Sequence, residues 1–171
     1  TNDRMAALVD VNNDGWLDIV TAVTMSDQLP RYLGHPRVYM NLGEIKGAWQ
    51  GFRYEYDRFP QLISKMGVAC NPRFLSIAAG DVTGDGFVDL YFGDCDTPES
   101  AYCPLIPENS QRDMDNKLLI NQGSANPGYF VDESLVRMTP ELLAGGLSSR
   151  NTIVDINGDG IKDILKLNAL G

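Results

Sequence analysis

The chain has 171 residues, 43% of them hydrophobic and 22% charged, with 14 Lys and Arg against 23 Asp and Glu and a formal net charge of −9. This composition is that of a globular protein and excludes wholesale disorder. No Lys and Arg run is present to neutralise nucleic-acid phosphates, no stretch reaches the ~18 apolar residues of a membrane span, and the N-terminal TNDRMAAL lacks a signal-peptide pattern.

The first predicted elements are two strands joined by an acidic loop. Residues 5–9 (MAALV) and 17–23 (LDIVTAV) are apolar and rich in β-branched side chains, and the loop DVNNDGWLD at 10–18 joins them. Two further strands are expected at 37–43 (RVYMNLG) and 51–57 (GFRYEYD), joined by a short glycine-bearing turn. This part of the chain therefore predicts four short strands.

The same order of elements recurs about 70 residues later in the chain. Strands are expected at 74–80 (FLSIAAG) and 88–93 (VDLYFG), on either side of the loop DVTGDGFVD at 81–89. A second hairpin follows, with strands at 117–123 (KLLINQG) and 128–134 (GYFVDES).

The segment 133–149 is the only stretch with helical punctuation, because Pro140 suits a first helical turn and Gly145–Gly146 suits a helix end. We predict one short helix there. Three apolar residues of the segment are expected to pack in the core or between repeats: Met138, Leu142 and Leu143.

A third repeat begins with strands at 151–154 (NTIV) and 162–167 (KDILKL) around the loop DINGDGIKD. Four antiparallel strands in each repeat of about 70 residues are typical of a β-propeller blade. We therefore predict an all-β fold with blade 1 at 3–73, blade 2 at 74–150 and the first half of blade 3 at 151–171. Because a ring needs at least about four blades, further blades are expected from the same chain or from neighbouring chains.

The three acidic loops share a nine-residue pattern, with Asp at positions 1, 5 and 9, Asn or Thr at position 3 and Gly at position 6. Their nine aspartates equal the whole charge excess of the chain. Two carboxylates about 4 Å apart repel each other by roughly 4 kcal/mol at an effective dielectric near 20, so each loop favours a bound cation. An EF-hand is excluded, because Thr21, Phe92 and Lys166 stand where its bidentate Glu would be.

The donor chemistry indicates Ca²⁺, since the loops contain hard oxygen ligands and neither Cys nor His; Mg²⁺, which seldom takes an all-protein cage, is the weaker alternative. We predict three Ca²⁺ sites, which would bring the formal charge from −9 to −3. Side chains at positions 1, 3, 5 and 9 and the backbone carbonyl at position 7 are the expected ligands. They are Asp10, Asn12, Asp14, Trp16 and Asp18; Asp81, Thr83, Asp85, Phe87 and Asp89; and Asp155, Asn157, Asp159, Ile161 and Asp163. Gly15, Gly86 and Gly160 are expected to turn the loops in the left-handed conformation.

The repeated motif D-x-[DN]-x-D-G-x-x-D, followed by an apolar strand, resembles the FG-GAP and VCBS repeats of bacterial surface proteins and of the integrin alpha-subunit propeller. The resemblance covers two full repeats and the start of a third. It implies calcium-binding blades with the ion held between the first and second strands. Thr83 replaces the usual Asp or Asn with a weaker neutral ligand, which predicts weaker binding in the second loop.

Strand direction places the metal loops and the short hairpin turns on one face and the long segments 21–36, 57–73, 92–116 and 134–150 on the other. Long loops on a rigid scaffold commonly form a binding surface. A protein or glycan partner is therefore expected on this second face; the alternative is that the segments only cover the neighbouring blade. The candidate contact residues are Arg31, Tyr32, Tyr102 and Arg112.

The three cysteines lack metal or redox spacing and lie near the second blade. One disulfide is expected. Cys95 with Cys103 is the shortest closure, and Cys70 can replace either partner.

The remaining candidates for chemistry are interpreted as structural. His35, the only histidine, is expected to be an exposed loop residue, and Trp16 and Trp49 are expected to be packing residues. No nucleophile–histidine spacing or phosphate-binding loop is present, so no catalytic residue is predicted.

Together these observations predict a non-catalytic calcium-binding β-propeller segment, extracellular or on the cell surface, that acts in adhesion or ligand binding. Two alternatives remain open. The segment can be a structural subunit of a surface filament or assembly, or a non-catalytic scaffold of a carbohydrate-active enzyme.

Overall fold

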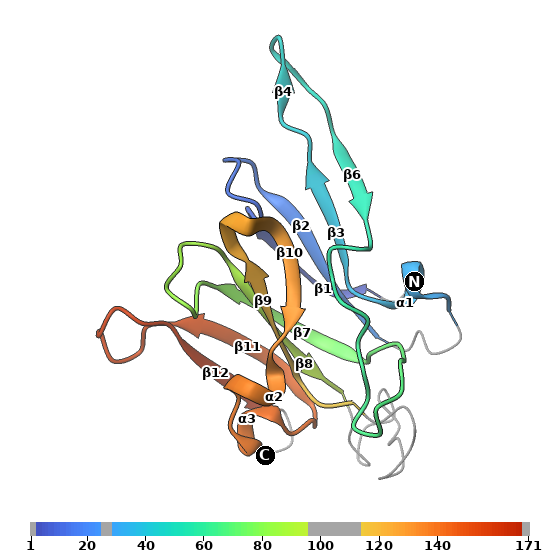
Figure 1. Ribbon diagram of the computed structural model, residues 1–171, viewed down its shortest axis with the longest axis vertical. Coiled ribbons are helices and arrows are strands. Elements are labelled where there is room, and N and C mark those ends of the chain that lie inside the picture. Colours follow the sequence, from blue (N-terminus) through green and yellow to red (C-terminus); the bar gives the residue numbers. More distant parts are fainter. Residues whose placement is uncertain (1–2, 25–28, 96–113, 169–171) are drawn as a thin grey trace.

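The computed structural model describes residues 3–24, 29–95 and 114–168, and these residues form antiparallel sheets that follow one another along the chain (Figure 1). The first sheet has four strands in the spatial order β1 (Asp3–Val9), β2 (Asp18–Val23), β3 (Arg37–Asn41) and β6 (Phe52–Glu55). Each strand therefore pairs with the next long strand in the chain, as in an up-and-down meander.

The second sheet repeats this order with β7 (Phe74–Gly80), β8 (Asp89–Asp94), β9 (Lys117–Gln122) and β10 (Asn126–Asp132). A two-stranded hairpin of β11 (Ser148–Val154) and β12 (Asp163–Asn168) follows. The predicted all-β fold of four-stranded repeats is confirmed.

The acidic loops close equivalent hairpins at the same register. The residue before each loop pairs with the last aspartate of the loop: Val9 with Asp18, Gly80 with Asp89, and Val154 with Asp163. The loops therefore occupy the same place in all three repeats.

The connection between β3 and β6 is longer than the short turn that was expected. A small hairpin of β4 (Glu44–Ile45) and β5 (Ala48–Trp49) extends it, and Figure 1 shows this hairpin projecting far beyond the sheet. The corresponding connection in the second sheet is the 3₁₀ turn η1 (Gly123–Ala125).

The segment after the second sheet holds two one-turn helices, α2 (Ser134–Arg137) and α3 (Pro140–Leu143), where one short helix was predicted. Pro140 begins α3 as expected, and the Thr139 hydroxyl accepts a hydrogen bond from the backbone N–H of Leu142. A further one-turn helix, α1 (Arg31–Gly34), was not predicted, because four residues carry no measurable helical period.

Two apolar cores join the repeats. The first core lies between the two four-stranded sheets and includes Val20, Val38, Phe74, Phe92 and Leu119. The second core joins the second sheet to the β11–β12 hairpin and to the helical segment, and it is built from Ala78, Tyr91, Leu118, Ile120 and Met138, with Leu142, Leu143, Ile153 and Ile164 packed against it. The predicted packing role of Met138, Leu142 and Leu143 is confirmed.

The prediction that His35 is exposed is wrong, since only 1% of the residue is accessible. Gly34 ends α1 in close contact with the Asn71 side chain, which a Cβ at Gly34 would meet at 2.2 Å. This close approach brings the following imidazole under the segment 59–71, where its Nε2 lies 3.2 Å from the carbonyl oxygen of Cys70 and 3.2 Å from the Gln61 amide nitrogen.

The prediction that both tryptophans are packing residues is also wrong, because Trp16 is 40% exposed and Trp49 is 58% exposed. Trp49 lies on the projecting β4–β5 hairpin, which no other layer covers (Figure 1). Its ring contacts Phe52, and its indole N–H donates to the Asn41 side chain at 2.8 Å.

Several predictions lie partly or wholly outside the described residues. These are the Cys95–Cys103 disulfide and the contact residues Tyr102 and Arg112. Within the described part, Cys70 is not in a disulfide and Cys95 is fully buried. None of the helices described here is long and apolar enough to cross a membrane.

Candidate metal centres

The aspartate at position 1 organises each loop through backbone hydrogen bonds. Its Oδ2 accepts from the N–H of the glycine at position 6, at 2.7 Å from Gly15, 2.8 Å from Gly86 and 2.8 Å from Gly160. These glycines have φ values of +90°, +87° and +90°, as predicted for the left-handed turn. The chain thus folds back over the first carboxylate.

The aspartate at position 5 accepts from the N–H of position 7, at 2.9, 2.9 and 2.8 Å in the three loops. In the first and third loops, the Asn at position 3 donates its side-chain N–H to this aspartate, at 2.9 Å in both. Thr83 of the second loop instead donates to Asp81 at 3.3 Å. The second loop therefore has a different hydrogen bond at position 3, the position where the sequence predicted a weaker ligand.

The aspartate at position 9 anchors the loop to the sheet. Asp18 and Asp89 are fully buried, and their Oδ2 atoms each accept from the N–H of position 2, Val11 or Val82, at 3.0 Å. Their Oδ1 atoms accept from the backbone of the third strand, at 2.7 Å from Asn41 and 2.9 Å from Asn121.

The corresponding aspartate of the third loop, Asp163, accepts from Ile156 N–H at 3.0 Å but is only half-buried. No third strand lies beside β12 among the described residues. The third loop therefore has the local fold of the others without the anchor on the next strand.

Asn41 and Asn121 are structural residues of these sites that the sequence reasoning missed. The Asn121 side chain donates to the carbonyl oxygens of Val11 at 2.8 Å and Val88 at 3.2 Å, and its Oδ1 accepts from two backbone N–H groups. The detectable signal is the shared N-x-G at 41–43 and 121–123, which places an Asn at the same point of both repeats.

The buried aspartates have perturbed acidity. Burial raises the pKa of Asp18, and the neighbouring carboxylates of Asp14 and Asp10 raise it further. Burial likewise raises the pKa of Asp89, with a further contribution from Asp85 and Asp81. Each of these loops therefore holds an excess of negative charge around a desolvated carboxylate.

The pKa values of two exposed carboxylates in the third loop are lowered and not raised. The Gly160 N–H is the main group that lowers the pKa of Asp155, and the Ile161 N–H is the main group that lowers the pKa of Asp159. These amides favour the ionised form, so the loop backbone is arranged around negative charge.

The loops lie along one side of the molecule, where Figure 1 shows the β1–β2, β7–β8 and β11–β12 connections following one another. The first two are directly joined, because the Asn13 side chain donates to the Gly86 carbonyl oxygen at 2.9 Å. The predicted arrangement of the loops on a common face agrees with this structure.

Each loop collects oxygen donors within nine residues, which is the donor type that Ca²⁺ takes. In the described part of the chain, no group of three or more His, Cys, Asp or Glu side chains is arranged to hold a metal ion. The carboxylate oxygens of the loop aspartates instead accept hydrogen bonds from the loop N–H groups described above. The residues fit a calcium ion by chemistry and local charge, and the ligand set remains a prediction.

Tandem four-stranded antiparallel meanders, each with an aspartate loop in its first hairpin, define a protein of the β-propeller-repeat class. Residues 10–92 match the FG-GAP-like repeat family. The match begins at the first aspartate loop and ends within β8, so it includes the second loop. A comparison with curated proteins found no match to the chain.

Proposed function

We propose that the chain is a calcium-binding segment of a β-propeller that acts outside the cell in adhesion or ligand binding, without catalysis of its own. The observation that carries this proposal is the recurrence of one oxygen-rich loop at one register in three successive hairpins. The fifteen ligands predicted above would hold three ions. Burial raises the pKa of Asp18 and Asp89, and repulsion by the neighbouring carboxylates adds to this. A bound ion would offset that repulsion.

An extracellular location is supported by the type of site. Calcium sites of extracellular modules have dissociation constants of about 10⁻⁴ to 10⁻³ M and need the calcium concentration found outside cells. A Cys95–Cys103 disulfide would suit the same oxidising compartment.

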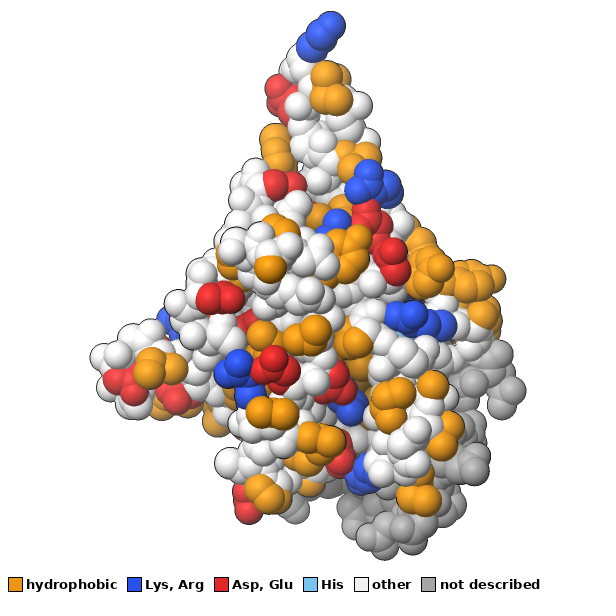
Figure 2. Space-filling model, in the orientation of Figure 1, with side chains coloured by type: hydrophobic (Ala, Val, Ile, Leu, Met, Phe, Trp, Pro, Cys, Tyr) orange, Lys and Arg blue, Asp and Glu red, His pale blue; other side chains and the backbone are white. Residues whose placement is uncertain are grey.

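The partner surface is proposed on the side of the long segments. A cavity of about 530 Å³ lies there between the segment 61–65 and the second sheet, and the exposed Leu135 and Val136 contribute to its lining. Two ion pairs border it, Lys65 with Asp115 at 3.2 Å and Lys117 with Asp132 at 3.1 Å. Figure 2 shows acidic and basic side chains next to apolar ones over this part of the surface, a mixture suited to a protein or glycan partner.

Thermal unfolding in calcium and in EDTA tests the proposal. An ion that binds only the folded state stabilises it by about 2.7 kcal/mol per site at a hundredfold excess over Kd. For a chain of this size each occupied site should raise Tm by roughly 5 °C or more. Equal Tm values in 10 mM Ca²⁺ and in EDTA would refute the calcium role, and an equal response to Mg²⁺ would refute the preference for Ca²⁺.

Matched variants locate the effect. Asp14→Asn and Asp85→Asn should each remove part of the calcium-dependent rise in Tm, because each replaces a predicted ligand in one loop. Asp57→Asn removes the same charge from an exposed position outside the loops and should leave the calcium response unchanged.

A further inference from the structure

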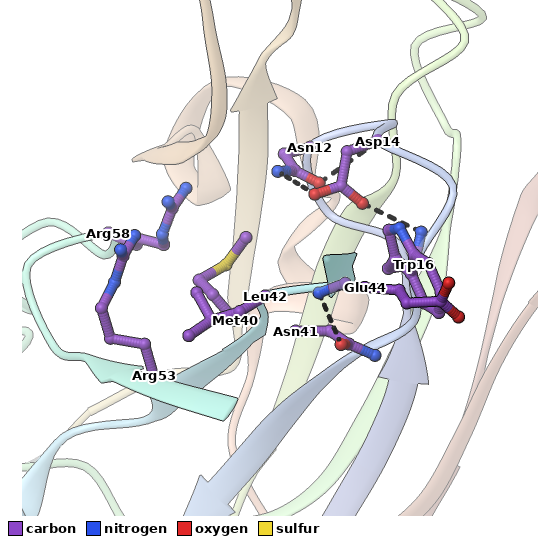
Figure 3. A pocket seen from close by; sticks show the side chains of 10 residues that line it. Asn12, Asp14, Trp16, Met40, Asn41, Leu42, Glu44, Arg53 and Arg58 are labelled. Carbon is purple, nitrogen blue, oxygen red and sulfur yellow. Dashed lines mark hydrogen bonds between the residues drawn. The ribbon is translucent and has the colours of Figure 1, made fainter. Parts of the chain in front are cut away.

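A second pocket lies beside the first aspartate loop. Its volume is about 380 Å³, and Figure 3 shows the first loop on one side of it, the turn after β3 on another, and two arginines facing them. Its lining includes Trp16, Met40, Glu44, Arg53 and Arg58. The volume suits a ligand of one ring and not a length of polypeptide.

Trp16 forms the aromatic wall of this pocket. One edge of its indole lies against Gly43, where a Cβ would be 2.7 Å from Nε1, so the ring is held in place while 40% of the residue remains exposed. A fixed, half-exposed indole offers an apolar ring surface to a ligand.

Arg58 forms the most ordered part of the cationic wall. Its side chain is 9% exposed, its Nε donates to Glu55 at 2.5 Å, its Nη1 donates to the Pro127 carbonyl oxygen at 3.2 Å, and its guanidinium lies 4.7 Å from the centre of the Tyr129 ring. Within the described residues, its Nη2 donates no hydrogen bond. The arginine is therefore held from three sides with donor capacity left at the pocket.

Arg53 adds a second guanidinium to the same carboxylate, since its Nε donates to Glu55 at 2.5 Å. Two arginines thus share one glutamate, and this wall carries a net charge of +1. Such a wall attracts an anionic group and can bind a carboxylate through paired N–H donors.

The second repeat lacks this pocket chemistry. Arg53 pairs with Met40 across the β3–β6 ladder, whereas Val131 pairs with Ile120 at the corresponding place in β9–β10. Gly123 lies against the second loop much as Gly43 lies against the first, with a Cβ placed 3.1 Å from Asp85 Oδ2, so the repeats differ in the arginine wall and not in this contact. The pocket is therefore a property of the first repeat and not of the repeat pattern.

We propose that this pocket binds a sugar acid: the pyranose ring lies against Trp16, its carboxylate faces Arg53 and Arg58, and Glu44 accepts from ring hydroxyls. A ring that carries an anionic group on one side and many hydroxyls on the other matches a pocket with an aromatic wall, a cationic wall and an acidic edge. The proposal goes beyond the calcium role, because the Trp16 and arginine side chains are not among the proposed side-chain ligands.

The test uses D-galacturonate and D-galactose, a pair that differs only at C6, together with D-glucuronate and D-glucose. Trp49→Phe leaves Trp16 as the only tryptophan of the chain, so its fluorescence reports on the pocket. In 1 mM Ca²⁺ we expect saturable quenching by at least one of the two acids, with affinity about tenfold or more above that for its neutral counterpart.

Calorimetry on matched variants assigns the contacts. Arg53→Gln should reduce the affinity for the acid to that for the neutral sugar, and Trp16→Ala should weaken both by about fivefold or more. Phe87→Ala, the equivalent change in the second loop, should leave sugar binding unchanged. Absence of binding at 50 mM of either acid, or binding that both Trp16→Ala and Arg53→Gln leave intact, would overturn the proposal. The Tm response to Ca²⁺ is read separately, so failure of one proposal is distinguishable from failure of the other.

Discussion

The first and second repeats share a hairpin, a register and an aspartate loop, but they differ in the turn behind that loop. In the first repeat the β4–β5 hairpin projects into solvent and leaves a pocket beside Trp16. In the second repeat the 3₁₀ turn η1 takes the place of that hairpin. The metal motif is therefore constant, and the turn opposite it varies and creates a separate surface.

The third loop extends the comparison, because it has the same local hydrogen bonds without a third strand in the described residues. Asp163 is half-buried, where Asp18 and Asp89 are fully buried. The short-range pattern thus folds the loop, and the neighbouring strand completes the environment of its last aspartate.

The largest expected effect comes from replacing the last aspartate of a loop, either where a third strand lies beside it or where none is described. Asp89→Ala leaves the N–H groups of Val82 and Asn121 without their acceptor in a buried site, and we expect a loss of about 3 kcal/mol in the free energy of unfolding. Asp163→Ala, at a half-exposed site, should cost less than about 1 kcal/mol. Urea denaturation in EDTA measures both without the contribution of a metal ligand. Equal losses would contradict the role assigned to the third strand.

The next largest loss of stability is expected for Asn121→Ala, and it exceeds the loss expected for Asn41→Ala. Asn121→Ala removes four hydrogen bonds, three of them buried, that hold the first loop, the second loop and the η1 turn, and should cost about 2 to 3 kcal/mol. Asn41→Ala acts at a more exposed position, where its partners can bond to water, and should cost about 1 kcal/mol. The same denaturation experiment compares them. A larger loss for Asn41→Ala would show that the projecting hairpin contributes more than its exposure indicates.

A third effect depends on pH and lies away from the loops. Burial, with a contribution from Arg31, lowers the pKa of His35 to about 4 from its ordinary value of 6.5. The unfolded state therefore takes up the proton first, so this contribution to stability is complete above pH 6.5 and is lost as the pH falls toward 4. Between pH 7 and pH 5 the loss should be about 2 kcal/mol.

His35→Gln provides the control for this pH dependence. Stability curves of the two proteins, measured by urea denaturation at pH 7, 6 and 5, should converge as the pH falls, because glutamine does not titrate. Parallel curves would show that His35 takes up its proton without a stability cost.

Much of the fold was predictable because it depends on local patterns. The ten long strands follow from short apolar runs rich in β-branched and aromatic residues. The glycine turns of the loops and the start of α3 at Pro140 follow from glycine's access to positive φ and from proline's fixed φ. The equivalence of the three loops was predictable from their spacing alone.

The features that the sequence did not predict depend on contacts between distant segments. His35 is buried because Gly34 lets Asn71 approach, and no signal in the sequence around residue 35 reports that contact. Asn121 reaches Val11, 110 residues away, and only the repeated N-x-G marks its position. Trp49 is exposed because a two-residue strand pair projects beyond the sheet, and strands so short carry no clear period.

The sequence by itself determined the repeat, the strand order and the oxygen-rich loops, since all of these depend on residues that lie close together in the chain. The tertiary structure decided which copy of a shared residue is buried, which loop gains an anchor on the next strand and where a pocket remains. These properties arise from packing between repeats, where the surroundings of each residue are supplied by segments that its own sequence does not describe.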